Sequence, residues 1–356
     1  MSGGVDSSVA AGLLAAQGHD VVGATLKLWG GASDSGCCSV GDVEDARRVA
    51  RQLGIPHHVF NMSDRFGDTV VDPYVAGHAR GETPNPCIEC NRHVKFGTLL
   101  DRARRLGFDA LATGHHARVV AGPGGTRLAR GRDQAKDQSY VLSMLTSEQL
   151  QAILLPVGDM TKDDVRQWAR LRGLSTAAKP DSQEVCFIQS TTGREAFLAE
   201  RVELHPGSLV DADSGEEVGT VPAVEMVTLG QRRGLGLGID GRRRFAIAVD
   251  VRGRRITVGH AGRTVTHSVS LHRWSWAVAP LRPGAPALAQ SSAHGRAVPC
   301  VVTAWGVEFA EPQRLVAPGQ TVALYDVGSP ELVVGSGVVA PAFEGEAAAP
   351  AAIAFG

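Results

Sequence analysis

In the first half of the chain, short apolar runs alternate with amphipathic segments of helical period. Residues 7–17 place Val9, Leu13 and Leu14 on one helical face, and Gly18 follows as a helix stop. Residues 21–28 form a β-branched, apolar run of the kind found in buried strands. The alternation continues with helices expected at 42–53, capped by Asp42, and at 95–106, and with strands at 57–60 and 110–112. This order predicts an α/β unit in which helices cover both faces of a parallel sheet.

The pattern changes after about residue 200, where short β-like runs separated by Gly and Pro replace the helical segments. These runs are residues 208–210, 244–249, 255–258, 297–304, 320–325 and 331–339. Short strands with such punctuation predict small β-rich domains or a barrel. The last residues, 344–356, are rich in Ala and Pro, and we expect them to be frayed.

The composition is that of an ordinary soluble globular protein, with 43% of the 356 residues hydrophobic and 21% charged. This length exceeds one hydrophobic core and predicts more than one domain. No apolar run approaches the roughly 20 residues that span a bilayer, so we expect no membrane contact. The chain start has no basic region followed by an apolar stretch, and we therefore expect a cytoplasmic location.

The net charge of −1 gives no hint of nucleic acid, so RNA binding would have to rest on local basic clusters. Arginine clusters occur at Arg102, Arg104 and Arg105; Arg232 and Arg233; Arg242, Arg243 and Arg244; and Arg252, Arg254 and Arg255. Each cluster either contacts phosphate or is a solvated surface, and the sequence leaves both interpretations open.

A glycine-rich loop opens the chain, where Ser2-Gly3-Gly4-Val5-Asp6-Ser7-Ser8 runs directly into the first predicted helix. Glycines let backbone amides turn toward an anion, and a helix N-terminus adds N–H donors and a favourable dipole. The loop lacks the Lys of a Walker A sequence. It resembles the pyrophosphate loop (PP-loop) of the ATP-pyrophosphatase superfamily, whose members cleave ATP to AMP and pyrophosphate while adenylating a substrate. A β-strand precedes the loop in that superfamily, and we expect its residues to lie upstream of Met1.

Six cysteines are the second source of candidate chemistry: Cys37, Cys38, Cys87, Cys90, Cys186 and Cys300. A chain of this size in a reducing compartment does not need disulfides, which leaves metal binding, catalysis or burial. Cys90 lies near a predicted helix start, where the dipole lowers the pKa of a thiol and favours the reactive thiolate. Cys87 and Cys90 also have the spacing of a zinc half-site or a redox pair. A zinc site needs a second pair nearby, and the adjacent Cys37 and Cys38 offer poor geometry for one.

Further segments make the chain resemble the tRNA-specific 2-thiouridylase family over nearly its whole length. The matching segments are residues 1–8, 37–46, 83–96, 112–116, 136–140, 179–188, 230–235, 312–314 and 317–320. No one of them is decisive, but together they are specific. Cys186, which alone would be interpreted as a buried structural cysteine, completes the set.

The resemblance implies three domains. Residues 1–198 form a PP-loop ATP-binding domain of the adenine-nucleotide alpha-hydrolase-like type, with its first strand missing. Residues 199–262 form a small central domain. Residues 263–356 form a C-terminal β-barrel with a frayed tail, and we expect the barrel to help clamp the tRNA.

The resemblance also implies a reaction. ATP, with Mg²⁺, is expected to bind the loop residues Ser2, Gly3, Gly4, Val5, Asp6 and Ser7, with Leu26 and Gly114 near the adenosine. The O2 of the wobble uridine, position 34, attacks the α-phosphate, and pyrophosphate leaves. Cys186 carries a persulfide and Cys90 is the nucleophile. Sulfur reaches C2, AMP departs, and the two cysteines end as a disulfide that must be reduced.

Contacts with tRNA follow from the same resemblance. Asn85, Pro86 and Cys87 match the segment that meets the target base, and His115, Lys136, Asp137, Gln138 and Gln320 match positions that touch tRNA. The base has to leave the anticodon stack to reach such a pocket. The implied partners are the tRNAs that read Lys, Glu and Gln codons, together with a cysteine desulfurase or a sulfur-relay protein as persulfide donor.

This chain departs from the family pattern at three places. Cys87 stands where many members carry an Asp that is a proposed acid–base group. Val221 and Ala223 replace a His-x-Gly pair, and Ser292 replaces an Arg expected near a barrel strand.

Two classes of alternative remain. Argininosuccinate synthetase, GMP synthetase and tRNA-lysidine synthetase resemble the loop but need neither Cys90 nor Cys186, and a 4-thiouridine synthetase would carry a further RNA-binding domain. The other class is a non-catalytic RNA-binding protein with a decayed site. Cys87 and the missing strand favour this interpretation, whereas the presence of Asp6, Cys90 and Cys186 argues against it.

Overall fold

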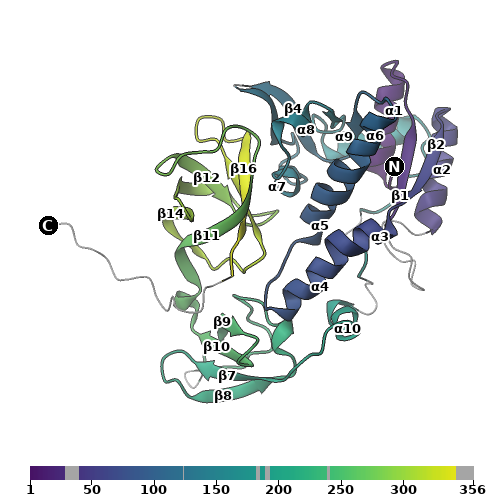
Figure 1. Cartoon of the computed structure of the whole chain (residues 1–356). Helices are drawn as coiled ribbons and strands as arrows, with labels where there is room; N and C mark the ends of the chain where they lie inside the picture. Colours follow the sequence, from purple (N-terminus) through teal and green to yellow (C-terminus); the bar gives the residue numbers. More distant parts are fainter. Residues whose placement is uncertain (29–39, 123, 182–184, 189–192, 239–240, 342–356) are drawn as a thin grey trace.

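The computed structural model describes residues 1–28, 40–122, 124–181, 185–188, 193–238 and 241–341. Figure 1 shows an N-terminal α/β unit, a small β-rich unit, and a β-barrel that contains the last strands. The predicted fold class, an α/β domain followed by a small central domain and a barrel, is confirmed. The predicted boundaries after residues 198 and 262 stay predictions, and the tail at 344–356 lies outside the described residues.

The N-terminal unit contains most of the helices. Its helical segments are α1 (Val5–Ala16), α2 (Val40–Leu53), α3 (Ser63–Phe66), the π-helical η1 (Gly67–Val71), α4 (Asp72–Ala79), α5 (Pro86–Glu89), the π-helical η2 (Cys90–Leu99), α6 (Leu100–Arg105), α7 (Ser139–Leu142), α8 (Ser147–Leu150), α9 (Lys162–Leu171) and α10 (Gly193–Ala199). Its strands are β1 (Gly23–Lys27), β2 (His57–Asn61), β3 (Leu111–Ala112), β4 (Ala117–Gly122), β5 (Gly125–Arg130) and β6 (Ile153–Leu154).

The strands β1 and β2 pair in parallel, and β3 and β6 form a second parallel pair. The helix α1 packs on α2 and α9 through Val9, Val49 and Val165, which are fully buried. Gly18 ends α1 as predicted, with a φ of +87° that suits glycine. Helices on parallel strands are thus the arrangement that the alternating pattern predicted.

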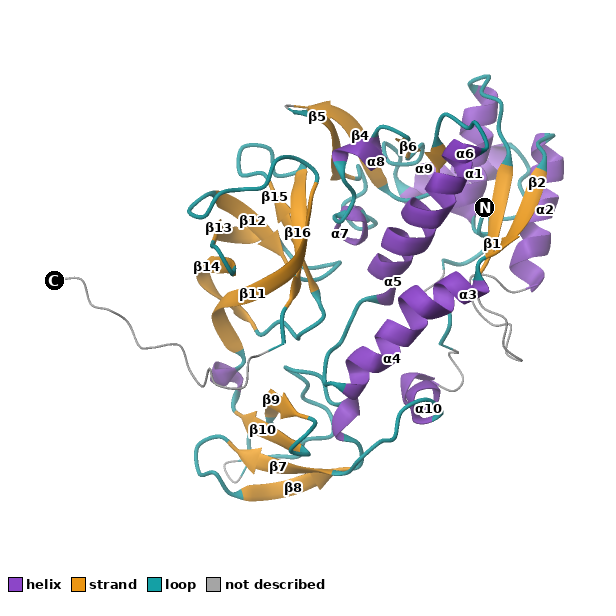
Figure 2. Cartoon of the chain, viewed as in Figure 1, coloured by secondary structure: helices purple, strands orange, loops and turns teal. Residues whose placement is uncertain are grey.

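Two helical rods, α3–η1–α4 and α5–η2–α6, lie side by side between the barrel and the β1–β2 pair (Figure 2). The second rod is longer than the helix predicted at 95–106, because it begins at Pro86. Asn85 precedes it as N-cap, and its side chain accepts hydrogen bonds from the amides of Cys87 and Ile88 at 3.0 and 3.4 Å. An Asn followed by Pro at the first helical position is itself a helix-start pattern.

One further prediction about a helix start is wrong. Asp42 is not the cap of α2, because the helix already includes Val40. The carboxylate of Asp42 instead accepts a bond from Lys179 at 2.6 Å.

The central unit is a four-stranded sheet in the order β8-β7-β10-β9. Its elements are β7 (Gly207–Asp211), β8 (Glu217–Val221), a 3₁₀ turn η3 (Val224–Met226), β9 (Phe245–Asp250), β10 (Arg255–Gly259) and a second 3₁₀ turn η4 (Ala261–Arg263). Leu209, Val224 and Ile256 are buried in its own small core. Val221 and Ala223, which replace the family's His-x-Gly pair, are also buried.

The C-terminal unit is a closed barrel with the strand order β11-β14-β13-β12-β15-β16. The strands are β11 (Val265–Trp276), β12 (Pro286–Gln290), β13 (Val298–Val302), β14 (Gly306–Arg314), β15 (Thr321–Tyr325) and β16 (Val333–Val339). Closure leaves no exposed sheet edge, because β11 pairs with β14 on one side and with β16 on the other.

The barrel and the N-terminal unit share one hydrophobic core. Tyr325 and Val333 of the barrel are fully buried together with Tyr140 and Leu128. The hydroxyl of Tyr140 donates to the carbonyl of Thr321 at 2.9 Å. A shared core of this kind fixes the barrel relative to the N-terminal unit.

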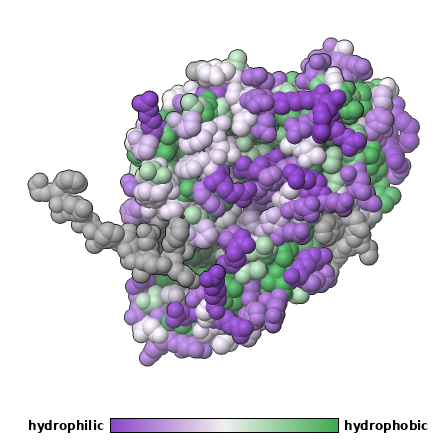
Figure 3. Space-filling model, in the orientation of Figure 1, coloured by the Kyte–Doolittle hydropathy of each residue, from purple (hydrophilic) through white to green (hydrophobic). Residues whose placement is uncertain are grey.

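Hydrophilic side chains cover most of the face seen in Figure 3, with smaller hydrophobic areas between them. Among the described residues, the model contains no helix that is both long and apolar enough to cross a membrane.

Candidate functional site

The N-terminal loop has the geometry of an anion site. Gly3 adopts a φ of +70°, and Gly4 is the extended residue that precedes α1. The hydroxyl of Ser7 bonds the carbonyl of Gly4 at 3.2 Å and accepts from the amide of Ser2 at 3.1 Å. The hydroxyl of Ser8 donates to the same carbonyl at 2.8 Å. These bonds fold the loop over the first turn of α1, where N–H groups and the helix dipole favour a phosphate.

Two glycines are required because backbone packs directly on the loop. A Cβ on Gly114 would lie 2.5 Å from the carbonyl carbon of Asp6 and 2.5 Å from the nitrogen of Ser7. A Cβ on Gly3 would lie 2.5 Å from the carbonyl oxygen of Asp42. The loop is therefore enclosed by residues that follow β3 on one side and by the start of α2 on the other.

Asp6 is the charged centre of the loop. Its carboxylate accepts bonds from the Lys162 ammonium at 2.7 and 2.8 Å and lies 3.2 Å from Nε2 of His116. Burial favours the neutral acid, but the bonds from His116 and Lys162 outweigh it and hold the pKa of Asp6 below its ordinary value. Asp6 is thus a carboxylate anion at the phosphate loop, and its two partners are Lys162 and His116.

A second carboxylate, Asp181, gathers the cations around the loop. It accepts from Lys162 at 2.8 Å, from Lys136 at 2.9 Å and from Arg166 at 2.9 Å. Burial opposes its ionisation, yet Lys162 and Lys136 hold the pKa of Asp181 at about 2. Three basic side chains therefore converge beside the loop, where a polyphosphate would be attracted.

The two cysteines assigned to catalysis belong to one cluster. Cys90 is 5% exposed, and Cys186 is half-buried against the same group of side chains. Leu26 of β1, which follows Thr25 whose hydroxyl donates to the carbonyl of Met1, packs on this cluster as well. Residues 26, 90 and 186, far apart in the chain, are therefore brought together.

Cys90 lies near a helix start, as predicted, but not at its first residue. It follows α5 as the first residue of η2, one turn inside the continuous rod that begins at Pro86. The exposed Cys87 lies in the first turn, which Asn85 caps. Cys300 faces the interior of the barrel, where burial raises the pKa of its thiol to about 11. Cys37 and Cys38 lie outside the described residues.

Several residues that the resemblance assigns to tRNA have partners within the protein. The carboxylate of Asp137 binds Arg130 at 2.8 Å, the amides of Gly131 and Ser139, and the hydroxyl of Ser139. The side chain of Gln138 accepts from the amide of His116 at 2.8 Å. These bonds give Asp137 and Gln138 a structural role, and their contact with tRNA stays a prediction.

His115 and Gln320 also have partners within the protein. Nδ1 of His115 contacts the hydroxyl of Thr113 at 2.8 Å, and burial together with the charge of Lys95 lowers the pKa of His115 well below its ordinary value. The amide of Gln320 donates to the carbonyl of Thr83. Gln320 thus joins the barrel to the segment that leads to Pro86 and Cys87.

A cavity of about 430 Å³ lies where the three units meet. Its lining includes Thr83, Arg194, Thr228, Ser292, Arg314 and Gln320. Ser292, at the position of the family's Arg, therefore faces a cavity that already has two guanidinium groups in its wall.

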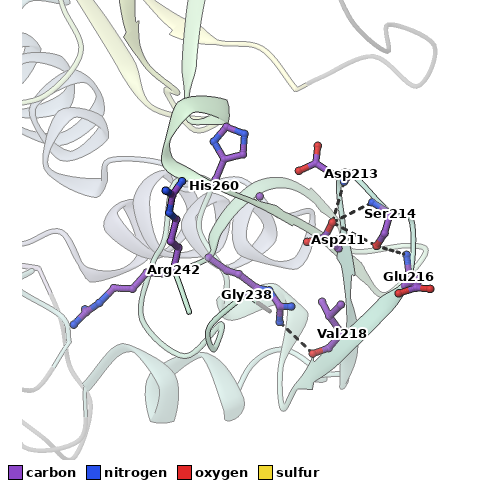
Figure 4. Close-up of a pocket in the computed structure, with 11 residues that line it drawn as sticks. Asp211, Asp213, Ser214, Glu216, Val218, Gly238, Arg242 and His260 are labelled. Atoms are coloured by element: carbon purple, nitrogen blue, oxygen red, sulfur yellow. Dashed lines mark hydrogen bonds between the residues drawn. The ribbon is translucent and has the colours of Figure 1, made fainter. Parts of the chain in front are cut away.

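A second cavity, of about 460 Å³, belongs to the central unit alone. Figure 4 shows Arg242 and His260 on one side of it and Asp211, Asp213 and Ser214 on the other. One of the predicted basic clusters, residues 242–244, is part of its wall. Arg244 of this cluster is buried and donates to the carbonyl of Val218, so it is not part of a solvated surface.

Among the described residues, no group of three or more His, Cys, Asp or Glu side chains could hold a metal ion. Cys87 and Cys90 therefore have no second pair within that part of the chain. The pattern also missed Lys162 and Arg166, and it assigned no role to His116, which lies in the quoted segment 112–116. Asp181 lies in a segment quoted for the resemblance. Its ion pairs join residues that are far apart in the sequence, so no local sequence pattern predicts them.

Known protein families match the chain in three successive parts. The tRNA methyl transferase HUP domain matches residues 1–190, the tRNA methyl transferase PRC-barrel domain matches 195–260, and the aminomethyltransferase beta-barrel domain matches 266–339. A solved structure of NMN synthetase from Francisella tularensis is 18% identical and covers 51% of this chain and 63% of its own, and its TM-score of 0.31 is too low to carry an argument.

Curated relatives match nearly end to end. The tRNA-specific 2-thiouridylase MnmA of Rhodococcus jostii (strain RHA1) is 44% identical over 95% of this chain and 96% of its own. The protein of that name from Acidothermus cellulolyticus is 44% identical over 96% of each chain. The one from Salinispora arenicola is 45% identical over 96% of this chain and 97% of its own. From the three matched domains and this identity over almost the full length, the chain belongs to the tRNA-specific 2-thiouridylase MnmA family.

Proposed function

We propose that this protein is a tRNA-uridine 2-sulfurtransferase, which replaces the O2 of a tRNA uridine with sulfur. The observation that carries the proposal is that Cys90 and Cys186 pack in one cluster with Leu26 of β1, the strand whose Thr25 hydroxyl donates to the carbonyl of Met1, just before the loop. Relatives at 44–45% identity that are named tRNA-specific 2-thiouridylases support the same reaction.

The first step is adenylation. The O2 of the uridine at the wobble position attacks the α-phosphorus of ATP, supplied as its magnesium complex, and pyrophosphate leaves. Ser2 to Ser7 and the N-terminus of α1 bind the phosphates, with Lys162 and Lys136 close by. Leu26 and Gly114 border the adenosine. Adenylation turns a poor leaving oxygen into AMP.

The second step is sulfur transfer. The terminal sulfur of a persulfide on Cys186 forms a bond to C2, and the C2–O bond to AMP breaks. The thiolate of Cys90 then attacks Sγ of Cys186, which breaks the S–S bond and leaves the sulfur on the base. The products are 2-thiouridine, AMP and a Cys90–Cys186 disulfide that an external thiol must reduce.

The remaining partners are proposed from the membership of the 2-thiouridylase family. The persulfide comes from a cysteine desulfurase or a sulfur-relay protein, and the substrates are the tRNAs for Lys, Glu and Gln. Asn85, Pro86 and Cys87 meet the base, and His115, Lys136 and Gln320 line its approach. The cell compartment that holds these partners is the cytoplasm.

Reconstitution tests the proposal. The protein is incubated with ATP, magnesium, unmodified tRNA and a persulfide source, and the digested nucleosides are analysed by mass spectrometry. Cys90→Ala and Cys186→Ala are expected to form no 2-thiouridine, and Cys300→Ala, a buried barrel thiol, serves as matched control. Product in both catalytic variants would contradict the roles of the two thiols. A methylated nucleoside in place of 2-thiouridine would contradict sulfur transfer itself.

A further inference from the structure

The segment that carries Cys186 is attached to the protein on both sides of this residue. On the C-terminal side, Phe187 is 4% exposed and packs edge-on against Phe66 and Tyr74, with ring centroids 5.7 and 5.4 Å apart. On the N-terminal side, the attachment is ionic and depends on Asp181. The two attachments differ in kind, because one is apolar and the other is charged.

The ionic attachment is made mainly by α9. Arg166 binds Asp181 at 2.9 Å and also donates to the carbonyls of Ala177 and Lys179 at 3.1 and 3.0 Å. Lys162, the first residue of α9, binds Asp181 at 2.8 Å. One carboxylate thus collects two cations from a single helix face, four residues apart.

The same cations lead to the nucleotide loop. Lys162 is 9% exposed and binds Asp6 as well as Asp181. Lys136, which follows the hairpin β4–β5 in the chain, is the third cation of the group and lies 2.9 Å from Asp181. Lys162 therefore joins Asp181 to Asp6 of the loop through two charge-assisted bonds.

The distance along the chain limits how far Cys186 can move from this attachment. Five peptide units separate Asp181 from Cys186, and a fully extended chain of that length spans at most about 18 Å. Among the described residues of this segment, Val185 and Cys186 also pack on the apolar cluster, and Lys179 pairs with Asp42 and Asp45 on α2.

We propose that Asp181 is a positioning residue for sulfur transfer, which ties the segment carrying Cys186 to the cations of the nucleotide loop through Lys162, Lys136 and Arg166. The role of Asp181 in catalysis rests on the proposed function. Its structural role concerns only the position of Cys186 relative to Cys90. Asp181 touches neither the base nor the sulfur in this account.

The direct test measures the rate at which Cys90 and Cys186 form a disulfide. Diamide takes up two electrons and two protons as two thiols form a disulfide, and a disulfide forms only when the Cβ atoms come within a narrow distance range. The Cys90–Cys186 linked peptide is quantified by mass spectrometry over time. Asp181→Asn is expected to slow its formation about tenfold, since small displacements of reacting groups cost rate steeply.

Matched variants separate position from charge and from folding. Asp181→Glu keeps the carboxylate and is expected to form the disulfide at the wild-type rate. Asp159→Asn removes an exposed carboxylate that lies 3.8 Å from Arg118, and it too is expected to leave the rate unchanged. Because Asp181→Asn could lower stability, thermal midpoints are measured for all variants, and Arg166→Gln tests the same attachment from the partner side. Wild-type rates in both Asp181→Asn and Arg166→Gln would overturn the inference.

Turnover gives the second readout. In Asp181→Asn, the rate of 2-thiouridine formation at saturating ATP is expected to fall about tenfold more than the rate of pyrophosphate release, because the variant acts on the position of Cys186. Unchanged kcat, or an equal loss in pyrophosphate release, would overturn the positioning role. If the wild-type protein forms no 2-thiouridine, the proposed function fails, and the disulfide rates still decide whether Asp181 positions Cys186.

Discussion

Single residues at the loop are constrained by contact distances. Gly114 lies against the backbone of Asp6 and Ser7, so a methyl group at this position has no room. Gly67, by contrast, has no atom within 4 Å of its hypothetical Cβ. Comparing alanine substitutions at Gly114 and at Gly67 therefore separates the effect of added volume from the effect of losing a glycine.

Gly114→Ala is expected to push the loop away from β3, to lower the rate of pyrophosphate release about tenfold, and to cost about 2 kcal/mol of stability from overpacking. Gly67→Ala in the helical η1 is the control and is expected to keep both properties. Pyrophosphate release with tRNA and ATP, together with denaturant unfolding, measures the two effects. Equal behaviour of the two variants would contradict the close packing.

His78 predicts a pH dependence of stability. It is 2% exposed and packs on Tyr74 at 4.6 Å, and burial, aided by the charge of Arg194, lowers its pKa to about 4. Above pH 6.5 the residue is neutral in both states and contributes nothing. As the pH falls below 6.5, the unfolded chain binds a proton that the native chain does not, so stability falls by about 1.4 kcal/mol per pH unit until pH 4.

The prediction is tested with His78→Gln, which does not titrate. Between pH 6.5 and pH 5, the wild-type protein should lose about 2 kcal/mol more unfolding free energy than the variant. Parallel losses in the two proteins would show that His78 is not buried in its neutral form.

Elements differ in how well the sequence predicts them. The loop, α1 and the glycine stops follow from local rules, and all were placed within a few residues. The long strand β11 was missed because its polar residues hide the apolar alternation. The hairpin β4–β5 was missed although Gly124, with a φ of +81°, lies between its strands. The ion pairs of Asp6 and Asp181 join residues up to 156 positions apart, so no local pattern contains them.

The rod that carries Cys90 depends on Asn85 for its first turn. Asn85→Ala is expected to cost about 1 kcal/mol, the usual value for a lost cap. Asn85→Asp keeps the acceptor oxygen and should keep stability. If Asn85 also meets the target base, Asn85→Asp will still lose 2-thiouridine formation, and full activity in this variant would limit Asn85 to capping.

At the scale of the whole molecule, Arg130 joins the barrel to the N-terminal unit. Its guanidinium lies 3.8 Å from the ring centroid of Tyr325 and bonds Asp137 and Gln290 at 2.8 and 2.7 Å. Tyr325 and Gln290 belong to the barrel, whereas Arg130 and Asp137 belong to the N-terminal unit. The barrel therefore keeps its orientation through one half-buried cation as well as through the shared core.

Arg130→Met should cost about 3 kcal/mol, because it leaves the carboxylate of Asp137 buried without its cation. Arg47→Met, which breaks an exposed pair with Glu44 at 2.7 Å, is the control and is expected to be nearly neutral. Calorimetry is expected to show a lower midpoint for Arg130→Met alone. Midpoints that shift equally would contradict the role of Arg130 between the units.

The central claim is that one protein couples ATP cleavage to sulfur transfer through two cysteines. The most direct measurement is the ratio of 2-thiouridine to pyrophosphate in a single incubation with ATP, tRNA and a persulfide source. The account predicts equal amounts in the wild-type protein, and pyrophosphate without 2-thiouridine in Cys186→Ala. Formation of 2-thiouridine without pyrophosphate, or in a protein that lacks both Cys90 and Cys186, would contradict it.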